Sequence, residues 1–396
     1  MTNAENSGRT KKILVLGGAG AMGTEACRDL ATTSGFEEIV IADIDLARVE
    51  KLAVSLGGGR VKPLKCDVTD HQAMVALMSG FGTVLNCTTY HFGLGLTRAA
   101  IEARAHYLDL GGLYNTPKQL ELTASAAGAG VAIVLGCGAT PGVTNLMARY
   151  GAERLDQVDA VHIAFASFRD LAPSPGLLDT ILDEFGSETV RFYYEKGKFI
   201  EVPAFAGERS VEFKAPIGAQ PTYLVPHSET HHLPRFLPRP PGRVDVRGTW
   251  RPEIMAALRT FHQAGLLSNE KLELPGGGEV GRRAFLRTHF LKTPFPAVNT
   301  DWAFLLNVEV AGTKDGRAVR RVYNTTHPAT SAWGQSGTAR VTGIPASIGA
   351  QLVAAGHYKG TGVLSPDAAL DPVEFFAELA KREILVHEEV HEEARL

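Results

Sequence analysis

Short apolar runs alternate with segments of helical periodicity through the first third of the chain. Lys12 to Leu16 is an apolar run that ends at a glycine cluster, and Ala21 to Leu30 continues with helix-forming residues; Glu38 to Ala42 and Asp45 to Leu56 repeat the pattern. Further strands are expected at 61–66, 83–87, 107–110 and 131–135, and further helices at 71–78, 94–103 and 117–127. This alternation predicts a parallel sheet with helices on both faces.

After Pro141 the pattern changes, which indicates a second domain. Ala160 to Ala166 and Val190 to Val202 resemble longer antiparallel strands, and Trp302 to Val310 with Ala318 to Asn324 have the look of a hairpin. A strand end followed by a helix is expected within 249–267, and further helices at 343–354 and after 371. These elements predict an open, mostly antiparallel sheet.

Composition narrows the class of protein. The chain has 396 residues, too many for one comfortable core, and its hydrophobic content of 44% is that of an ordinary globular protein. A net charge of −3 makes nucleic acid and anionic membranes unlikely main partners, so we expect small molecules instead. The four cysteines are widely spaced and the first ten residues lack an apolar run. We therefore expect a cytoplasmic enzyme with a short flexible start.

The glycine cluster has the spacing of a dinucleotide-binding turn. Gly18, Gly20 and Gly23 follow a strand and open a helix. In such a turn the first glycine permits the tight bend, the second leaves room for the pyrophosphate, and the third lets helix and strand pack closely. The phosphates then meet the helix N-terminus. A turn for another nucleotide, such as S-adenosylmethionine, is the alternative.

Asp43 ends the second strand, where a carboxylate hydrogen-bonds the adenosine ribose and repels a 2′-phosphate. NAD is therefore favoured as the cofactor, and NADP is the alternative because Arg48 lies nearby. Asp67 follows the third strand and either approaches the adenine or caps a surface turn.

Ligands of doubly wound sheets bind outside the carboxyl ends of the strands, so the residues after each strand are expected to line a pocket. Three segments fit this description: Cys87–His91, Asp109–Gly112 and Gly136–Gly142. Thr144 and Asn145 begin the next helix, where they serve equally well as helix caps.

Several segments resemble the saccharopine dehydrogenase-like family of amino-acid dehydrogenases and reductases. They are GGAGAMG with ADID, HYLDLGG, GATPGVTNLMA, VRGTW and TGIPASIGAQLVA, and together they span most of the chain. LDLGG and PGVTN are most similar to lysine 6-dehydrogenases, while saccharopine reductases and carboxynorspermidine dehydrogenases share the same frame. The turn at Arg251–Glu253 and the run His227–His232 depart from the family pattern, so the substrate is left open.

The resemblance implies an α/β fold: an N-terminal Rossmann domain with a doubly wound parallel sheet, and an inserted α+β domain for substrate and dimerisation. We place the Rossmann domain at 1–145, the α+β domain at 146–330, and C-terminal helices that return to the Rossmann domain at 331–396. A homodimer is expected.

The expected site residues form three groups. For the cofactor they are Gly18, Gly20, Ala21, Met22, Gly23, Asp43, Ile44, Arg48, Asp67, Val68, Cys87, Thr88, Thr89, Asp109 and Gly111. For the substrate they are Gly112, Thr140, Pro141, Thr144, Asn145, His231 and Arg251. For catalysis they are Tyr90, His91 and His227. No metal site is expected.

Hydride transfer at a carbon–nitrogen bond needs an acid or base for the nitrogen's proton and donors for a carboxylate. Tyr90 and His91 follow the fourth strand, although a lone histidine there is often only a packed or capping residue. His227, Glu229, His231 and His232 are the densest titratable cluster in the second half of the chain; a solvated loop and a zinc site are the alternatives. Cys137 is expected to fill space.

Three functions are compatible with these residues. The first is an NAD-dependent oxidoreductase acting on an amino acid or amine, by oxidative deamination or imine reduction. The second is a homospermidine-synthase-like transferase that keeps NAD as a prosthetic group, and the third is a nucleotide-sensing protein without catalysis.

Overall fold

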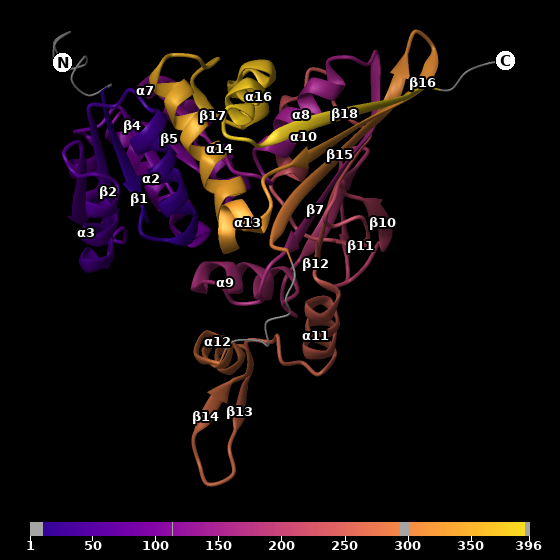
Figure 1. Cartoon of the computed structure of the whole chain (residues 1–396). Coiled ribbons are helices and arrows are strands. Elements are labelled where there is room, and N and C mark those ends of the chain that lie inside the picture. The colour runs from indigo at the N-terminus through magenta and orange to yellow at the C-terminus, as the bar shows by residue number, and fades with distance from the viewer. Residues whose placement is uncertain (1–10, 113, 294–300, 393–396) are drawn as a thin grey trace. The chain divides into compact units, whose positions relative to one another are not determined.

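The computed structural model describes residues 11–112, 114–293 and 301–392. The expected flexible start at residues 1–10 lies outside the described residues. The chain divides into two compact units. The first comprises the chain up to Gln157, His227–Pro240 and Ala339–Val386, and the second comprises Val158–Pro226, Pro241–Thr338 and the chain from His387. Figure 1 labels the elements of both.

The first unit contains a seven-stranded sheet in which all six pairs of neighbouring strands are parallel. Its strands are β1 (Lys12–Leu16), β2 (Glu38–Asp43), β3 (Val61–Lys65), β4 (Thr83–Asn86), β5 (His106–Asp109), β6 (Ala132–Val134) and β17 (Gly362–Leu364). Their order is β17-β6-β5-β4-β1-β2-β3. The direction of winding reverses between β1 and β4, and ligands of such sheets bind at this switch point.

Helices connect the strands of the first unit. They are α2 (Ala21–Thr33), α3 (Leu46–Ser55), α4 (His71–Met78), η1 (Tyr90–Phe92), α5 (Gly93–Glu102), α6 (Thr116–Leu120), α7 (Thr123–Ala129), α8 (Val143–Ala152), α10 (Glu229–Phe236), α14 (Gly337–Ala354), α15 (Pro366–Ala369) and α16 (Pro372–Ala380). The single helix expected at 117–127 is thus two short helices. The predicted doubly wound parallel sheet is confirmed.

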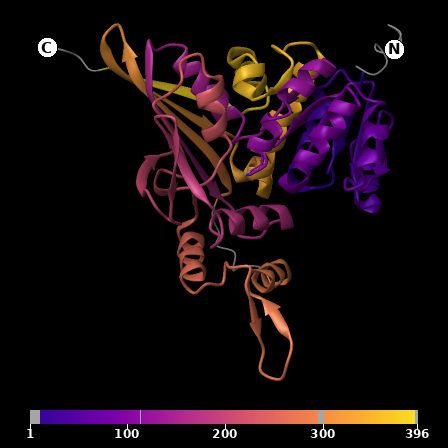
Figure 2. The same ribbon diagram turned by 180° about the vertical axis from the view of Figure 1, so that it is seen from behind.

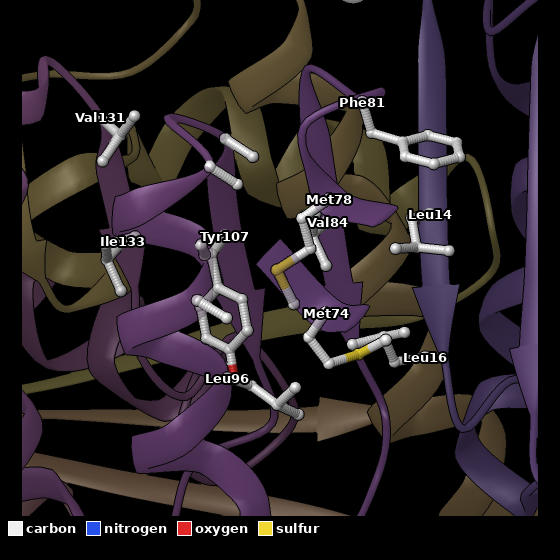
Figure 3. Packing of buried hydrophobic residues seen from close by; sticks show 14 of the residues in the cluster. Leu14, Leu16, Met74, Met78, Phe81, Val84, Leu96, Tyr107, Val131 and Ile133 are labelled. Atoms are coloured by element: carbon white, nitrogen blue, oxygen red, sulfur yellow. The ribbon is translucent and has the colours of Figure 1, made fainter. Parts of the chain in front are cut away.

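One hydrophobic core fills the space between this sheet and α4 and α5 (Figure 3). Met74 and Met78 of α4 and Leu96 of α5 are at most 2% exposed, and they pack in one cluster with Leu14 of β1 and Tyr107 of β5. Burying a side chain of this size stabilises the fold by about 1.5–3 kcal/mol. The apolar runs that predicted the strands therefore also form the core.

Helix α14 packs onto the first unit. A Cβ atom at Gly343 would lie 2.4 Å from the Met22 carbonyl oxygen of α2, and one at Gly349 would lie 2.3 Å from the Cys137 sulfur. Glycine at both positions permits this close approach. The domain boundaries given above stay a prediction.

The second unit is built on a nine-stranded mixed sheet (Figures 1 and 2). Its strands are β7 (Gln157–Phe168), β8 (Arg191–Glu195), β9 (Lys198–Val202), β10 (Arg209–Glu212), β11 (Ala219–Leu224), β12 (Arg243–Trp250), β15 (Ala303–Lys314), β16 (Arg317–Thr326) and β18 (Leu385–Glu392). The remaining elements are α9 (Pro175–Glu184), α11 (Pro252–Gln263), the hairpin β13 (Lys271–Glu273) and β14 (Glu279–Gly281), α12 (Arg282–Lys292), α13 (Thr330–Trp333) and η2 (Gly334–Ser336).

The main path of this sheet runs β10-β11-β12-β7-β15-β16-β18. β12 pairs parallel with β7, whereas β15 and β16 form the predicted antiparallel hairpin. The strand expected over 190–202 is a hairpin, because Lys196 and Gly197 adopt positive φ angles and turn the chain.

The segment after Pro226 is helical. Residues 229–236 form helix α10, which excludes the alternative of a solvated loop, and Glu229 and His232 on it are fully buried. The segment lies in the first compact unit. The reason is packing: Ser228 and Glu229 hydrogen-bond residues that follow β5 and β6.

Candidate functional site

The turn after β1 is shaped by four glycines, one more than the sequence pattern names. Gly17 has φ +68°, and a Cβ there would lie 2.8 Å from the Thr88 nitrogen. The tight bend is therefore at Gly17, not at Gly18 as expected. Gly18 is required for another reason, since its Cβ would lie 2.3 Å from Cγ2 of Ile41 on β2.

Gly20 and Gly23 differ in the space that surrounds them. A Cβ at Gly23 would lie 2.3 Å from the Gly17 carbonyl oxygen, so only glycine lets α2 pack on the turn. A Cβ at Gly20 would meet nothing closer than the Gly17 oxygen at 3.1 Å, which leaves open space beside the backbone. Helix α2 begins directly after it, at Ala21, with no acidic residue in its first turn. The turn therefore fits a diphosphate, bound by N–H groups at the helix start.

Asp43 and Arg48 flank this turn together. Oδ2 of Asp43 accepts a hydrogen bond from the Ala19 N–H at 3.2 Å, and Nη2 of Arg48 donates to the Ala19 carbonyl at 2.5 Å. Asp43 ends β2 and Arg48 lies in α3, so a carboxylate and a cation both contact the backbone of Ala19. The geometry accommodates both NAD and NADP.

We expect Asp43→Ala to raise the ratio of kcat/KM for NADP to that for NAD by about tenfold, since hydrogen bonds to a charged group contribute about 1.5–3 kcal/mol. Steady-state kinetics with both cofactors measures the ratio. Asp45→Ala is the matched control, because Asp45 caps α3 by accepting from the Arg48 N–H at 3.2 Å. An Asp43→Ala ratio equal to that of the wild type would remove Asp43 from the cofactor site.

Asp67 lies in a turn after β3. It is exposed and its Oδ1 accepts hydrogen bonds from the Thr69 N–H at 3.0 Å and the Thr69 hydroxyl at 2.7 Å, which lower its pKa. The cap of α4 is Asp70. Val68 is half-buried and Ile44, after β2, is 65% exposed. Contacts of these three residues with a cofactor stay predictions.

Asp109 at the end of β5 holds two neighbouring turns in place. It is 4% exposed, and its Oδ1 accepts from the Gly111 N–H at 2.9 Å and the Gly136 N–H at 2.8 Å. Gln119 donates to its Oδ2 at 3.1 Å. Burial raises the pKa of Asp109, although these hydrogen bonds oppose the shift. Asp109 therefore holds the turns after β5 and β6 in place, and its contact with a cofactor stays a prediction.

The turn after β6 packs tightly on the turn after β5. A Cβ at Gly111 or Gly136 would lie 2.6 or 2.5 Å from Cγ of Pro141, and both glycines have positive φ. A Cβ at Gly142 would lie 2.0 Å from the Gly138 carbonyl oxygen. This packing places Thr140 and Thr144 at the carboxyl end of the sheet with little freedom.

Both threonines bind one buried carboxylate. Oε1 of Glu229 accepts from the hydroxyls of Thr140 at 2.6 Å and Thr144 at 2.9 Å, and Nδ1 of His227 lies 3.1 Å from Oε2. Glu229 is 0% exposed and His227 is 8% exposed. Burial alone would raise the pKa of Glu229, but His227 and the Thr140 hydroxyl hold it below its ordinary value. The carboxylate therefore stays charged and fixes the His227 imidazole.

This pair adjoins the residues that follow β4 and β5. The Ser228 hydroxyl lies 2.9 Å from the Thr116 hydroxyl and 3.3 Å from the Gly112 carbonyl oxygen. A Cβ at Gly112 would lie 3.1 Å from the Tyr90 Cβ. Tyr90, Gly112, Thr140, Thr144 and His227 thus belong to one cluster at the carboxyl ends of β4, β5 and β6.

The other predicted residues that follow β4 are Cys87, Thr88, Thr89 and His91. His91 is exposed and stacks on Tyr90 with a centroid separation of 4.1 Å. The Cys87 N–H donates to the Leu16 carbonyl, and Thr88 donates from its N–H and hydroxyl to Asn86. Thr89 is exposed. Cys87 and Thr88 border the glycine turn, because a Cβ at Gly17 would lie 2.9 Å from the Cys87 carbonyl carbon and 2.8 Å from the Thr88 nitrogen. Contacts of these four residues with a cofactor stay predictions.

Asn145 is engaged at both ends of its side chain. It accepts from the Gly142 N–H at 3.0 Å and donates to Asp367 at 2.8 Å, so it caps α8. Cys137 is buried, and burial raises the pKa of its thiol to about 12, as suits a space-filling residue. In the second unit, Arg251 is 1% exposed and lies 2.8 Å from Glu253. Its role toward a substrate stays a prediction.

His232 is buried in α10, and neither ring nitrogen has a hydrogen-bond partner. Burial lowers its pKa from 6.5 to about 3, and burial likewise lowers that of the half-buried His231 to about 4. Below pH 6.5 the unfolded chain gains a proton at residue 232 that the folded chain does not. The protonation of His232 therefore does not lower the free energy of unfolding above pH 6.5, and it lowers it progressively as the pH falls from 6.5 toward 3.

We expect His232→Leu to remove this acid sensitivity. The variant should be at least as stable as the wild type at pH 7, because it replaces unpaired buried nitrogens by carbon, and more stable by about 2 kcal/mol at pH 5. Urea unfolding at the two pH values measures the difference. Equal losses of stability on acidification in both proteins would contradict it.

Two features are absent from the described ranges. Within 11–112, 114–293 and 301–392, no three His, Cys, Asp or Glu side chains are grouped to hold a metal ion. In the same ranges, no helix combines the length and the apolar character needed to cross a membrane.

A seven-stranded parallel sheet with a glycine turn at its switch point is typical of dinucleotide-binding oxidoreductases. Residues 13–134 match the saccharopine dehydrogenase NADP binding domain, and residues 138–385 match the saccharopine dehydrogenase C-terminal domain. The chain belongs to the saccharopine dehydrogenase family. The predicted enzyme class, an NAD(P)-dependent dehydrogenase or reductase, and the predicted NAD or NADP cofactor are confirmed.

Two curated relatives match nearly the whole chain. Carboxyaminopropylagmatine dehydrogenase of Synechocystis is 25% identical, with 96% of this chain and 98% of the relative covered. Carboxynorspermidine synthase of Vibrio cholerae is 24% identical, with 91% and 94% covered. Saccharopine dehydrogenase of Pyricularia oryzae is 27% identical over 66% of this chain and 59% of its own length.

Solved structures show the same fold. Apo saccharopine dehydrogenase of Saccharomyces cerevisiae superposes with a TM-score of 0.69 at 17% identity, covering 96% of this chain and 99% of that one. Homospermidine synthase of Legionella pneumophila, in complex with NAD, gives a TM-score of 0.63 at 15% identity, covering 96% and 91%.

Proposed function

We propose that this protein transfers a hydride at a carbon–nitrogen bond, reducing the imine formed between a primary amine and an aldehyde-bearing amino acid, or oxidising the resulting secondary amine. One observation carries the proposal: the buried His227–Glu229 pair at the carboxyl ends of β5 and β6. In a sheet with this switch point, the nicotinamide half of a dinucleotide extends to these strands.

His227 is the proposed acid and base. Its Nδ1 donates to the charged Glu229, so Nε2 is the atom that gives a proton to the substrate nitrogen in reduction or takes one in oxidation. Glu229, held by Thr140 and Thr144, fixes the tautomer and stabilises the charged imidazole. Tyr90 borders the same cluster and is the proposed hydrogen-bond donor to the substrate.

NAD(P) supplies and accepts the hydride when bound. Gly20 and the start of α2 would hold its diphosphate, and Asp43 with Arg48 would hold the adenosine ribose. The tightly packed turns at Gly112 and Pro141 provide a rigid surface beside His227.

The proposed substrates follow the full-length relatives. The names carboxyaminopropylagmatine dehydrogenase and carboxynorspermidine synthase both describe an amine that carries a carboxylated chain. They support a polyamine-type amine over the free lysine of a lysine 6-dehydrogenase. A cytoplasmic location and a homodimer remain predictions, the first supported by four cysteines without disulfides.

Absorbance of NADH and NADPH tests the proposal. Purified protein is mixed with agmatine and aspartate semialdehyde, and separately with lysine and NAD. We expect cofactor oxidation only when both agmatine and the semialdehyde are present. Reduction of NAD by lysine alone would favour the deaminase instead. Exchange of amines without any change in cofactor absorbance would favour the transferase related to homospermidine synthase.

A further inference from the structure

A cavity of about 350 Å³ lies on one face of the nine-stranded sheet. All of its lining residues belong to the second unit, so it is separate from the His227 cluster of the first unit. Strands β7, β12, β15 and β16 form its floor, and β10 and β18, at opposite edges of the sheet, both contribute to its wall. Lys214 after β10 and Glu389 of β18 lie 2.6 Å apart. The sheet therefore curls around the cavity.

The floor is polar where a central sheet is normally apolar. Arg247, Asn307 and Asn324 line the cavity and are at most 7% exposed on β12, β15 and β16, and Asp245 is buried beside Arg247. Burying such groups costs free energy unless they find partners. Ala164, Val211 and Phe213 also line the cavity and belong to an adjoining apolar cluster. The polar groups are thus gathered at the cavity instead of being spread over the sheet.

These groups offer both a donor and an acceptor to the cavity. Nδ2 of Asn307 donates to Oδ1 of Asn324 at 3.0 Å. This bond leaves Oδ1 of Asn307 as a side-chain acceptor and Nδ2 of Asn324 as a side-chain donor. Nε of Arg247 donates to Asp245 at 2.8 Å, with Nδ1 of His162 2.8 Å from the same carboxylate. Burial opposes ionisation of Asp245, but His162 and the arginines hold its pKa well below its usual value.

Charged side chains of both signs line the cavity and form ion pairs with one another. Glu309 lies 2.9 Å from Arg209 and 3.3 Å from Arg320, and its side chain is 13% exposed. Lys214 pairs with Glu389, and Glu212 is also part of the lining. An array balanced in this way disfavours polyanions and polycations, because either would meet like charges.

We propose that this cavity is a second, non-catalytic binding site for a small zwitterion, a molecule that carries one carboxylate and one ammonium group. Arg247 and Asn324 bind the carboxylate, and Glu309 with the Asn307 carbonyl binds the ammonium. The volume is in the range of small-molecule sites.

Isothermal titration calorimetry of the full chain with γ-aminobutyrate, butyrate and butylamine tests the site. We expect γ-aminobutyrate to bind about tenfold more tightly than either singly charged probe, a difference of about 1.4 kcal/mol. Val322 of β16 is half-buried and lines the cavity. Val322→Trp should therefore fill the cavity, and Val322→Ala is the matched control. Val322→Trp should abolish the binding and Val322→Ala should keep it.

His227→Asn separates this site from the catalytic one and should leave γ-aminobutyrate binding unchanged. Circular dichroism checks the fold of each variant. If Val322→Trp does not fold, Arg320→Gln replaces it, because the Arg320 side chain is 48% exposed and pairs with Glu309, so its loss should change the binding of γ-aminobutyrate. The proposal is overturned if none of the probes binds, if binding persists in folded Val322→Trp, or if only His227→Asn abolishes it. Dimerisation that Val322→Trp disrupts, without binding of any probe, would instead make the cavity an interface between two copies.

Discussion

His227→Asn should lower kcat by about 10²- to 10⁴-fold, the range for loss of a general acid or base. The glycine turn and Asp43 are unchanged in this variant, so the Kd for NADH should stay within about twofold. Stopped-flow reduction and NADH fluorescence titration measure the two quantities. His71→Asn is the matched control, since His71 of α4 also faces a carboxylate, Glu102 at 3.0 Å, but belongs to no predicted site group, so kcat should stay near the wild-type value.

Glu229→Gln sharpens this prediction. Glutamine keeps acceptor oxygen for Thr140 and Thr144 but removes the charge that His227 faces. We expect a lower kcat together with a shifted pH profile, because the charged imidazole loses its partner. A full kcat in His227→Asn, or an unshifted profile in Glu229→Gln, would remove the pair from the chemistry.

Gly20→Val should weaken NADH binding by at least about tenfold while leaving the fold intact. Gly20 has φ −70° and ψ 171°, a conformation open to any residue, and an added Cβ meets only the Gly17 oxygen at 3.1 Å. The free energy of unfolding should therefore change by less than about 1 kcal/mol. The new side chain instead occupies the space for the diphosphate.

Gly35→Val is the matched control, because Gly35 is exposed with no heavy atom within 4 Å of the added Cβ. NADH fluorescence titration and urea unfolding are measured on both variants. Unimpaired NADH binding by Gly20→Val would place the diphosphate elsewhere.

The Rossmann sheet was predictable because its signals are local. The apolar run at Lys12–Leu16 coincides with β1, and the strand predicted at Glu38–Ala42 is one residue shorter than β2. Ile13–Leu16 of β1 and Ile39–Ala42 of β2 are buried, so each strand stands out as a continuous apolar run. The hairpin at 190–202 was read as one longer strand because Lys196 gives no turn signal of its own.

The site was only partly predictable, for the opposite reason. Thr140, Thr144 and His227 were named from the sequence, but the carboxylate that joins them was placed only in a titratable cluster. Glu229 lies 85 positions from Thr144 in the sequence. Their hydrogen bond forms because His227–Pro240 belongs to the first unit, although the residues before and after it belong to the second. The roles of Gly17 and Asp109 likewise follow from contacts with Thr88 and Gly136, which strand and helix patterns do not reveal.

Transfer of deuterium from the nicotinamide to the new carbon–nitrogen centre tests the central claim most directly. The protein is incubated with agmatine, aspartate semialdehyde and NADH deuterated at the transferable C4 position, and the product is analysed by mass spectrometry. We predict a secondary amine that carries one deuterium at the reduced carbon. A secondary amine without deuterium, or no coupled product with any amine and aldehyde, would contradict a hydride-transferring enzyme of carbon–nitrogen bonds.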